Sequence, residues 1–171
     1  MHVIHKIESV YNFESKILIL GTMPSPSSRS AGFFYMHPQN RFWPVMEKVF
    51  DAKFAYSNSA QNKEAAVKER IEFLLKNKIA LWDVLARCDI EGAKDSSIKN
   101  VVPNDFSLIL SSSKIEKIFC TGKKSFSLYE KLCSQKYSVP YDVLPSTSPA
   151  NAVWTLEKLA KEYELKLKAF L

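Results

Sequence analysis

Four short apolar runs recur along the chain and predict β-strands. They cover residues 17–20, 79–85, 115–120 and 141–144. The first run, Ile17 to Leu20, is continuous, aliphatic and stopped by Gly21, which favours a strand buried on both faces over an alternating edge strand. The second, third and fourth runs fit the same interpretation because each has the length of a strand rather than of a helix.

Apolar residues recur at helical spacing in the segments next to these runs. This pattern predicts helices over 42–49, 67–75, 126–133 and 156–170. Alternation of strand and helix is typical of a mostly parallel sheet covered by helices on both faces. We therefore predict an α/β protein, a three-layer α/β/α sandwich with a four-stranded mostly parallel central sheet, in one domain spanning residues 1–171.

Two segments interrupt the alternation. Pro24 and Pro26, with serines at 25, 27, 28 and 30, favour irregular backbone after the first strand. Residues 89–105 contain Gly92, Ser96, Ser97 and Pro103. We expect this second segment to be a loop excursion within the same domain.

Composition and charge narrow the possible functions. The chain has 171 residues with 46% hydrophobic content, enough to bury a sizeable core. Its formal net charge of +6 and pI near 9.1 favour a polyanionic partner, because lysine and arginine release counterions from phosphates. Many basic proteins bind no nucleic acid, so the charge alone leaves both alternatives open.

Three scattered cysteines, Cys88, Cys120 and Cys133, predict neither a disulfide framework nor a zinc site. We expect a reduced, cytoplasmic compartment and no metal or cofactor. Residues 1–15 lack the apolar core of a signal peptide, and no apolar run approaches the roughly 20 residues that span a bilayer. The protein is expected to be soluble, with no membrane partner, and monomeric.

Polar loops follow the predicted strands and should gather at the carboxyl edge of the sheet, where open α/β sheets bind ligands. They cover 21–40, the residues after Asp83, 121–124 and 145–151. The first loop leads into GFFYMHPQNRFW at 32–43. A flat aromatic face beside amides and one cation suits a nucleobase that has left its helix.

Each of these side chains also has a structural interpretation. Tyr35 could belong to the core, as aromatic clusters commonly do. His37 could bond to backbone, Asn40 could cap the following helix, Trp43 could be buried packing, and Asp83 could satisfy amides at a strand end. The sequence contains no GxSxG, GxGxxG, P-loop or HExxH motif. The usual support for several hydrolase and nucleotide-binding classes is therefore missing.

Two further loops could contact phosphate. Lys123 and Lys124 follow Gly122 at a predicted helix start, where cations oppose the helix dipole unless an anion lies nearby. The loop at 145–151 is rich in hydroxyls and could either bind phosphate or form a plain turn before the last helix.

At these residues the chain resembles the uracil-DNA glycosylase superfamily. HPQNRFW at 37–43 resembles the HPxNRFW block of mismatch-specific uracil-DNA glycosylases, and GTMPS at 21–25 lies where their GINPG motif does. The similarity is nearest to the hypoxanthine-DNA glycosylase branch. Its GSFPS-type, HPQNRFW, LWDV, DSSI and LPSTSPAN motifs correspond here to 21–25, 37–43, 81–84, 95–98 and 144–151.

The resemblance implies monofunctional excision of deaminated bases from DNA: hypoxanthine from deoxyinosine, with uracil as a second candidate. It gives Tyr35 the role of stacking on the flipped base. It assigns the shaping of the substrate pocket to Gly21, Thr22, Met23, Pro24, Ser25 and His37. It makes 148–151 the phosphate clamp and the wedge that enters the gap left by the base. Together with the phosphate-binding interpretation of the two loops above, it leads us to expect that DNA is bound by Lys123, Ser146, Thr147, Ser148 and Asn151.

The catalytic residue implied by the resemblance is Asn40. Other superfamily members carry aspartate or asparagine in the first motif to orient water, whereas this chain has Met23, and Ser146 replaces the usual histidine or asparagine of the second motif. A thioether cannot do that work. In the hypoxanthine branch the asparagine of HPQN does it, and an amide carbonyl could aim a water at an oxocarbenium-like state.

Two other functions stay open. The chain could be a noncatalytic nucleic-acid or nucleotide-binding module that has lost its general base at Met23, or it could hydrolyse free modified nucleosides. Binding without turnover would identify the first, and activity on mononucleosides the second.

Overall fold

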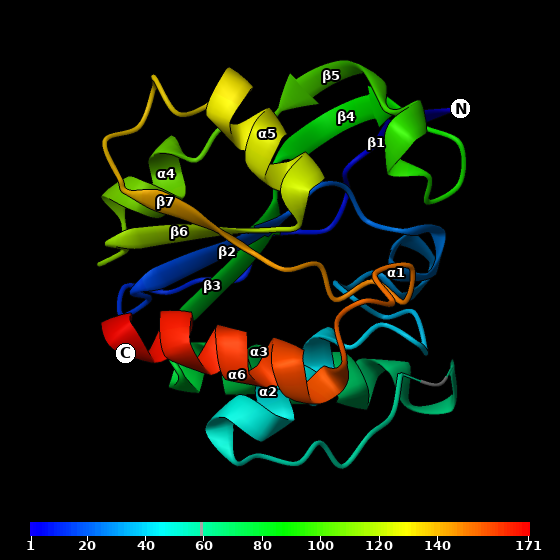
Figure 1. The fold of residues 1–171 in the computed structure, drawn as a ribbon, viewed down its shortest axis with the longest axis vertical. Helices are drawn as coiled ribbons and strands as arrows, with labels where there is room; N and C mark the ends of the chain where they lie inside the picture. Colours follow the sequence, from blue (N-terminus) through cyan, green and yellow to red (C-terminus); the bar gives the residue numbers. More distant parts are fainter. Residues whose placement is uncertain (59) are drawn as a thin grey trace.

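A four-stranded parallel sheet forms the centre of the molecule (Figure 1). The computed structural model describes residues 1–58 and 60–171. The sheet order is β3-β2-β6-β7, and the strands are β2 Ile17–Gly21, β3 Ile79–Asp83, β6 Lys117–Thr121 and β7 Tyr141–Leu144. All three pairings are parallel. The predicted α/β fold with a four-stranded parallel central sheet is confirmed.

Helices cover both faces of this sheet. Ile17 and Ile19 of β2 pack into a core with α2 Phe42–Phe50, α3 Lys63–Lys76 and α6 Leu156–Leu167. Leu18 and Leu20 pack into a second core on the other face, beneath α4 Ser107–Ser111 and α5 Lys123–Leu132. Figure 1 shows these two groups of helices on opposite sides of the sheet. The four β2 side chains are fully buried because both faces are covered.

A second, antiparallel sheet corrects two predictions. Its order is β1-β4-β5, with β1 His2–Ile4, β4 Leu85–Asp89 and β5 Lys99–Pro103. The apolar run at 79–85 is therefore not one strand but is divided at Val84. Residues 89–105 are not a plain loop, because they contain β5 and the short helix η2 Asp95–Ser97.

The physical reason for both errors is the partial burial of these strands. In β4 buried positions alternate irregularly with exposed ones, and in β5 no residue is fully buried. The pairing also shifts register between β4 and β5. Such strands show no continuous apolar run, and their pairing depends on partners far away in the sequence.

The segment after the first strand is a third place where the structure differs from the prediction. Residues expected to be irregular form α1, Pro26–Ala31. Pro26 occupies the first turn, and the Ser25 hydroxyl accepts a hydrogen bond from the Ser28 amide at 3.2 Å. Proline and serine at these positions favour a helix start, and Gly32 ends the helix with φ 70°. The same residues that forbid a continued helix thus begin a new one.

The end of the chain follows the predicted helix closely. In α6 the side chains of Leu159, Tyr163 and Leu167 are buried. Thr155 caps its first turn by accepting from the Lys158 amide at 3.3 Å, and the last turn, η3 Lys168–Phe170, is a 3₁₀ helix. The short helix η1 Ala60–Asn62 precedes α3. Within the described ranges, no helix combines the length and the apolar character needed to cross a membrane.

Candidate active site

A cavity of about 160 Å³ opens at the carboxyl edge of the parallel sheet. Gly21, Asp83 and Thr121, the last residues of three adjacent strands, lie along it. Its other lining residues come from three segments: residues 22–40, residues 90–95 and the loop after β7. Pockets for drug-sized ligands measure roughly 300–1,000 Å³, so this cavity suits a single planar ring system.

Tyr35 borders this cavity as a rigidly held ring. Phe42 stacks on it with ring centroids 4.1 Å apart and an interplanar angle of 13°. Its hydroxyl lies 2.9 Å from the hydroxyl of Thr121. Burial, and to a smaller extent the nearby Asp83 carboxylate, raise the pKa of Tyr35, so the phenol is protonated at neutral pH.

The backbone of Tyr35 is strained. Its φ is 55°, in the left-handed region, which costs a residue with a side chain about 1–2 kcal/mol. The Asn58 side-chain amide donates to the Tyr35 carbonyl at 3.4 Å. Strained residues of this kind cluster at binding and active sites. The conformation therefore supports a functional role for Tyr35 at the cavity.

The neighbouring aromatic residues are mainly structural. Phe33 and Trp43 are buried in the core and stack with centroids 5.9 Å apart. The Trp43 indole donates to the Phe34 carbonyl at 3.0 Å. Phe34 is also buried but does border the cavity. The structural interpretation of Trp43 is confirmed.

Asn40 lies on the cavity with its amide oxygen already engaged. Oδ1 accepts from the Phe42 amide at 2.9 Å and from the Thr147 hydroxyl at 2.9 Å. Two donors use both lone pairs of an amide oxygen, and the Phe42 N–H fixes which end of the amide is oxygen. The expectation that the carbonyl aims a water is therefore not met. The Nδ2 group remains, and no acceptor for it is found among residues 1–58 and 60–171.

The first motif, residues 21–25, lines the cavity as the sequence predicts, but some of its residues also pack against the core or contact α1. Gly21, Thr22 and Met23 all border the cavity, and Met23 also packs against the core under α5. The Pro24 carbonyl accepts from Arg29 at 2.7 Å, while the Ser25 hydroxyl caps α1. The cavity wall at 21–25 is thus held in place by α1.

His37 does not lie among the residues that line the cavity. Its Nδ1 accepts from the Gln39 amide at 3.1 Å, and its carbonyl accepts from the Asn40 amide at 3.0 Å. The structure therefore supports the backbone-bonded interpretation of this residue. Its contribution to the pocket is the turn that leads into Asn40.

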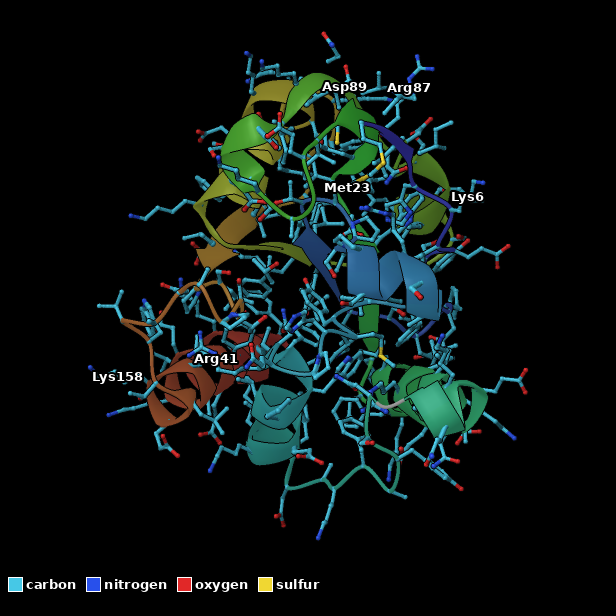
Figure 2. All side chains as sticks on the ribbon, turned by 90° about the vertical axis from the view of Figure 1, so that its right-hand side faces the viewer. Lys6, Met23, Arg41, Arg87, Asp89 and Lys158 are labelled. Atoms are coloured by element: carbon cyan, nitrogen blue, oxygen red, sulfur yellow. The ribbon has the colours of Figure 1, made fainter. Side chains whose placement is uncertain are left out.

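Arg41 fastens the loop after β7 to the start of α2. Its guanidinium donates to the carbonyls of Ser148 at 2.7 Å, Asn151 at 3.0 Å and Thr147 at 3.4 Å, and also to that of Trp154. Figure 2 shows Arg41 beside this loop, just before α6. One planar cation thus fixes four carbonyls of a loop expected to bind DNA.

Replacing Arg41 with lysine should loosen this loop. A lysine cannot reproduce the forked geometry, so we expect the free energy of unfolding to fall by about 2 kcal/mol and DNA affinity to fall about tenfold. Urea unfolding would measure the free energy of unfolding, and fluorescence anisotropy would measure the affinity for DNA. Arg87→Lys is the matched control, because Arg87 is exposed on β4 and lies far from Arg41 in Figure 2. Equal effects of the two substitutions would contradict the assignment.

A second, larger hollow adjoins the cavity. Its volume is about 720 Å³, and it shares Asp95, Thr121, Ser146 and Ser148 with the first. Among the residues that line it are Lys123, Lys124, Asn151, Trp154 and Lys166. Thr147, by contrast, is buried and lines the first cavity. The residues expected to bind DNA are therefore split between the two hollows.

Sequence reasoning missed a buried pair at the base of the cavity. His5 Nε2 lies 2.7 Å from Asp83 Oδ2, and the two side chains are only 2% and 6% exposed. Asp83 therefore bonds to a side chain rather than to strand-end amides. The position of Asp83 at the end of an apolar run was the available signal, whereas nothing in the sequence marks His5.

Comparisons with known proteins identify the family of this chain. Residues 8–171 match the model of the uracil DNA glycosylase superfamily. A protein of Methanosarcina barkeri named hypoxanthine DNA glycosylase is 31% identical over 143 residues, which cover 83% of this chain and 84% of that protein. A protein of the same name from Methanosarcina acetivorans is 29% identical, covering 84% and 85%.

The fold is similar to a solved structure as well. The solution NMR structure of a candidate uracil DNA glycosylase from Methanosarcina acetivorans superposes with a TM-score of 0.77, at 29% identity, and the match covers 99% of both chains. With a family model matched over nearly the whole sequence, the chain belongs to the uracil DNA glycosylase superfamily.

Proposed function

We propose that this protein is a monofunctional DNA glycosylase that hydrolyses the N-glycosidic bond of deoxyinosine in base excision repair. Uracil is a second candidate substrate. The observation that carries the proposal is a cavity of about 160 Å³ that brings together a fixed aromatic ring and an amide. The family and the two relatives named hypoxanthine DNA glycosylase support it. We further propose that the chain acts in the cytoplasm, as one domain and as a monomer.

The cavity can receive a base only after the base leaves the duplex. Unstacking and unpairing the target base costs a few kcal/mol, and this cost is smaller for damaged or mispaired bases. Tyr35 offers a ring face for the flipped base, since Phe42 already covers the opposite face. The hollow lined by Lys123 and Lys124 continues from the cavity and suits the sugar-phosphate chain.

The proposed reaction is hydrolysis at the sugar. A water oxygen forms a bond to C1′, the C1′–N9 bond breaks with its electron pair moving onto the purine, and a water proton is released. The transition state has oxocarbenium character, so the placement of the water and the electrostatics of the site matter more than a strong base. Asn40 would hold the water by donating from Nδ2, because its oxygen is occupied by Phe42 and Thr147.

A gel assay tests the proposal. The protein is incubated in EDTA with duplexes containing inosine, uracil or normal bases, and abasic sites are then cleaved with alkali. Breaks at inosine are expected, because deglycosylated sites are labile to alkali while the EDTA excludes nucleases that need divalent metal. Retardation of the duplex without breaks would contradict the proposal and favour a noncatalytic module, which the thioether of Met23 in the first motif makes a reasonable second candidate.

Lys123 provides a test of the DNA track. Lys123→Ala should weaken binding to all DNA sequences alike and lower the slope of log affinity against log salt by about one. Lys131→Ala is the control, since Lys131 is exposed at the other end of the same helix and its substitution also removes one positive charge. Anisotropy titrations at several salt concentrations measure both. Identical slopes for the two variants would remove Lys123 from the DNA-binding surface.

A further inference from the structure

A buried arginine lies close to the candidate site without lining its cavity. Arg70 belongs to α3, and its side chain is only 3% exposed. The guanidinium carbon lies 4.7 Å from the centroid of the Phe54 ring and 5.3 Å from that of the Trp43 ring. In the part of the chain that the structure describes, its one ion pair is with Glu69, whose Oε2 lies 3.8 Å from Nη1, too far for a hydrogen bond. Burying a cation without a bonded carboxylate is unfavourable for folding, and the ring contacts offset only part of that cost.

The guanidinium of Arg70 donates its hydrogen bonds mainly to the segment before α3. Nη2 donates to Asn58 Oδ1 at 2.8 Å and to the Tyr56 carbonyl at 3.1 Å, and Nη1 donates to the Ala66 carbonyl at 3.0 Å. A guanidinium can only donate, so its bond to Asn58 fixes which end of that amide is oxygen. The NH₂ group of Asn58 therefore faces away from the arginine.

The NH₂ group of Asn58 bridges two carbonyls of the loop that carries the proposed site residues. Nδ2 lies 3.4 Å from the Tyr35 carbonyl oxygen and 3.4 Å from that of His37. The His37 carbonyl also accepts from the Asn40 amide at 3.0 Å. One side chain thus contacts the backbone of the proposed stacking residue and the turn that leads into the proposed catalytic amide. Both of its bonds are long, so they depend on how Asn58 is oriented.

Tyr35 requires this support because its backbone is strained. Its φ of 55° lies in the left-handed region, and a strained residue persists only where its surroundings hold it. The ring is held by stacking on Phe42, and the hydroxyl by Thr121. The carbonyl is held by Asn58. Relaxation of Tyr35 to a negative φ would redirect its side chain and move the ring relative to the cavity.

We propose that Arg70 and Asn58 form a positioning relay, in which Arg70 orients the Asn58 amide and Asn58 holds residues 35–40 in the geometry that excision needs. Neither side chain lines the cavity, so both act through Tyr35 and Asn40 rather than on the substrate. The relay gives the buried cation a role, because an apolar side chain could fill the same volume but could not orient an amide. The inference rests on the proposed function for its reaction.

Asn58→Asp separates the two ends of the relay. The aspartate keeps an acceptor for Arg70 but has no donor, and its charge repels the carbonyls of Tyr35 and His37. The ion pair gained with the arginine opposes the loss of the two long hydrogen bonds, so the midpoint of urea unfolding should stay close to the wild-type value. Single-turnover excision of hypoxanthine should nevertheless fall about tenfold to a hundredfold, because a displacement of about 1 Å at a reacting site costs up to a hundredfold in rate.

Asn77→Asp is the matched control. Asn77 is half-buried like Asn58, and its Nδ2 donates to the Phe73 carbonyl at 2.9 Å. The substitution makes the same change in chemistry and charge but does not touch the cavity, so excision should stay at the wild-type rate. Asn58→Ala, which removes the donor without adding charge, should slow excision too and serves if Asn58→Asp does not fold. Arg70→Lys, which keeps the charge without the planar fork, should also slow excision.

An NMR measurement reports the position of the ring without relying on activity. The Tyr35 and Phe42 rings, with centroids 4.1 Å apart, should give NOEs between their ring protons in the wild type and weaker ones in Asn58→Asp.

The outcomes separate this inference from the proposed function. A wild-type excision rate for Asn58→Asp overturns the inference even though inosine is excised, and so does a loss of rate matched by a loss of stability, which would mark a purely structural role. A wild-type rate for Arg70→Lys removes Arg70 from the relay. If the wild type releases no base, the proposed function fails, and the NOEs alone decide the inference: weaker NOEs in Asn58→Asp support it and unchanged NOEs overturn it.

Discussion

Replacing Asn40 with alanine is expected to lower single-turnover excision of hypoxanthine about 100- to 1,000-fold. This is the typical loss when one preorganised polar group is removed from an enzyme that stabilises a charged transition state. In this chain the effect should come from Nδ2, since Oδ1 already binds Phe42 and Thr147. Quenched-flow or manual single-turnover assays on an inosine duplex, with enzyme in excess, measure the rate free of product release.

Two controls separate catalysis from structure in this experiment. Asn40→Ala also removes a helix-start hydrogen bond, worth about 1 kcal/mol. Asn77→Ala removes a comparable bond at the end of α3, where the side chain donates to the Phe73 carbonyl at 2.9 Å, and should leave excision unchanged. Thr147→Val removes one of the two bonds to Oδ1. If it slowed excision as much as Asn40→Ala, the amide would serve to hold the loop rather than the water.

The parallel sheet could be predicted because its strands are recognisable as apolar runs in the local sequence. Ile17 to Leu20 are buried on both faces, so every residue is apolar and the run is visible without knowledge of its partners. The antiparallel sheet was not. Val3 of β1 pairs with Cys88 of β4, which lies far away in the sequence. Both residues are buried, yet each lies in a short strand with exposed neighbours. The pattern of such strands becomes apparent only once the partner is known.

The same distinction applies to the site. Tyr35 and Asn40 lie on the cavity because the loop that carries them follows a recognisable buried strand, and parallel strands end at a common edge. The bond between His5 and Asp83 joins residues 78 positions apart. It depends on the segment after β1 running antiparallel beside β3, where Val10 bridges to Leu81, and no local pattern specifies that pairing. The occupied oxygen of Asn40 likewise depends on Thr147, which a loop brings back from the far end of the chain.

Replacing Gly21 with alanine is expected to abolish excision of hypoxanthine, with a fall of at least about 100-fold. The added methyl group would lie 2.3 Å from Asp83 Oδ1 and 3.0 Å from the Tyr35 hydroxyl. Both groups belong to the buried end of the cavity and have little freedom to move, because His5 holds Asp83 and Phe42 packs on Tyr35. A displacement of about 1 Å in such a site can cost a hundredfold in rate.

The control for Gly21→Ala is a glycine whose substitution affects only the backbone. Gly32 has φ 70° and nothing within 4 Å of an added methyl group, so Gly32→Ala should destabilise the fold by about 1 kcal/mol and leave excision intact. Overpacking at Gly21 should cost a further 1–3 kcal/mol or so in unfolding free energy. Urea unfolding and single-turnover excision are measured for both variants. If Gly21→Ala excised hypoxanthine at the wild-type rate, the base could not be entering the cavity beside Gly21 and Tyr35, and the stacking role of Tyr35 would have to be abandoned.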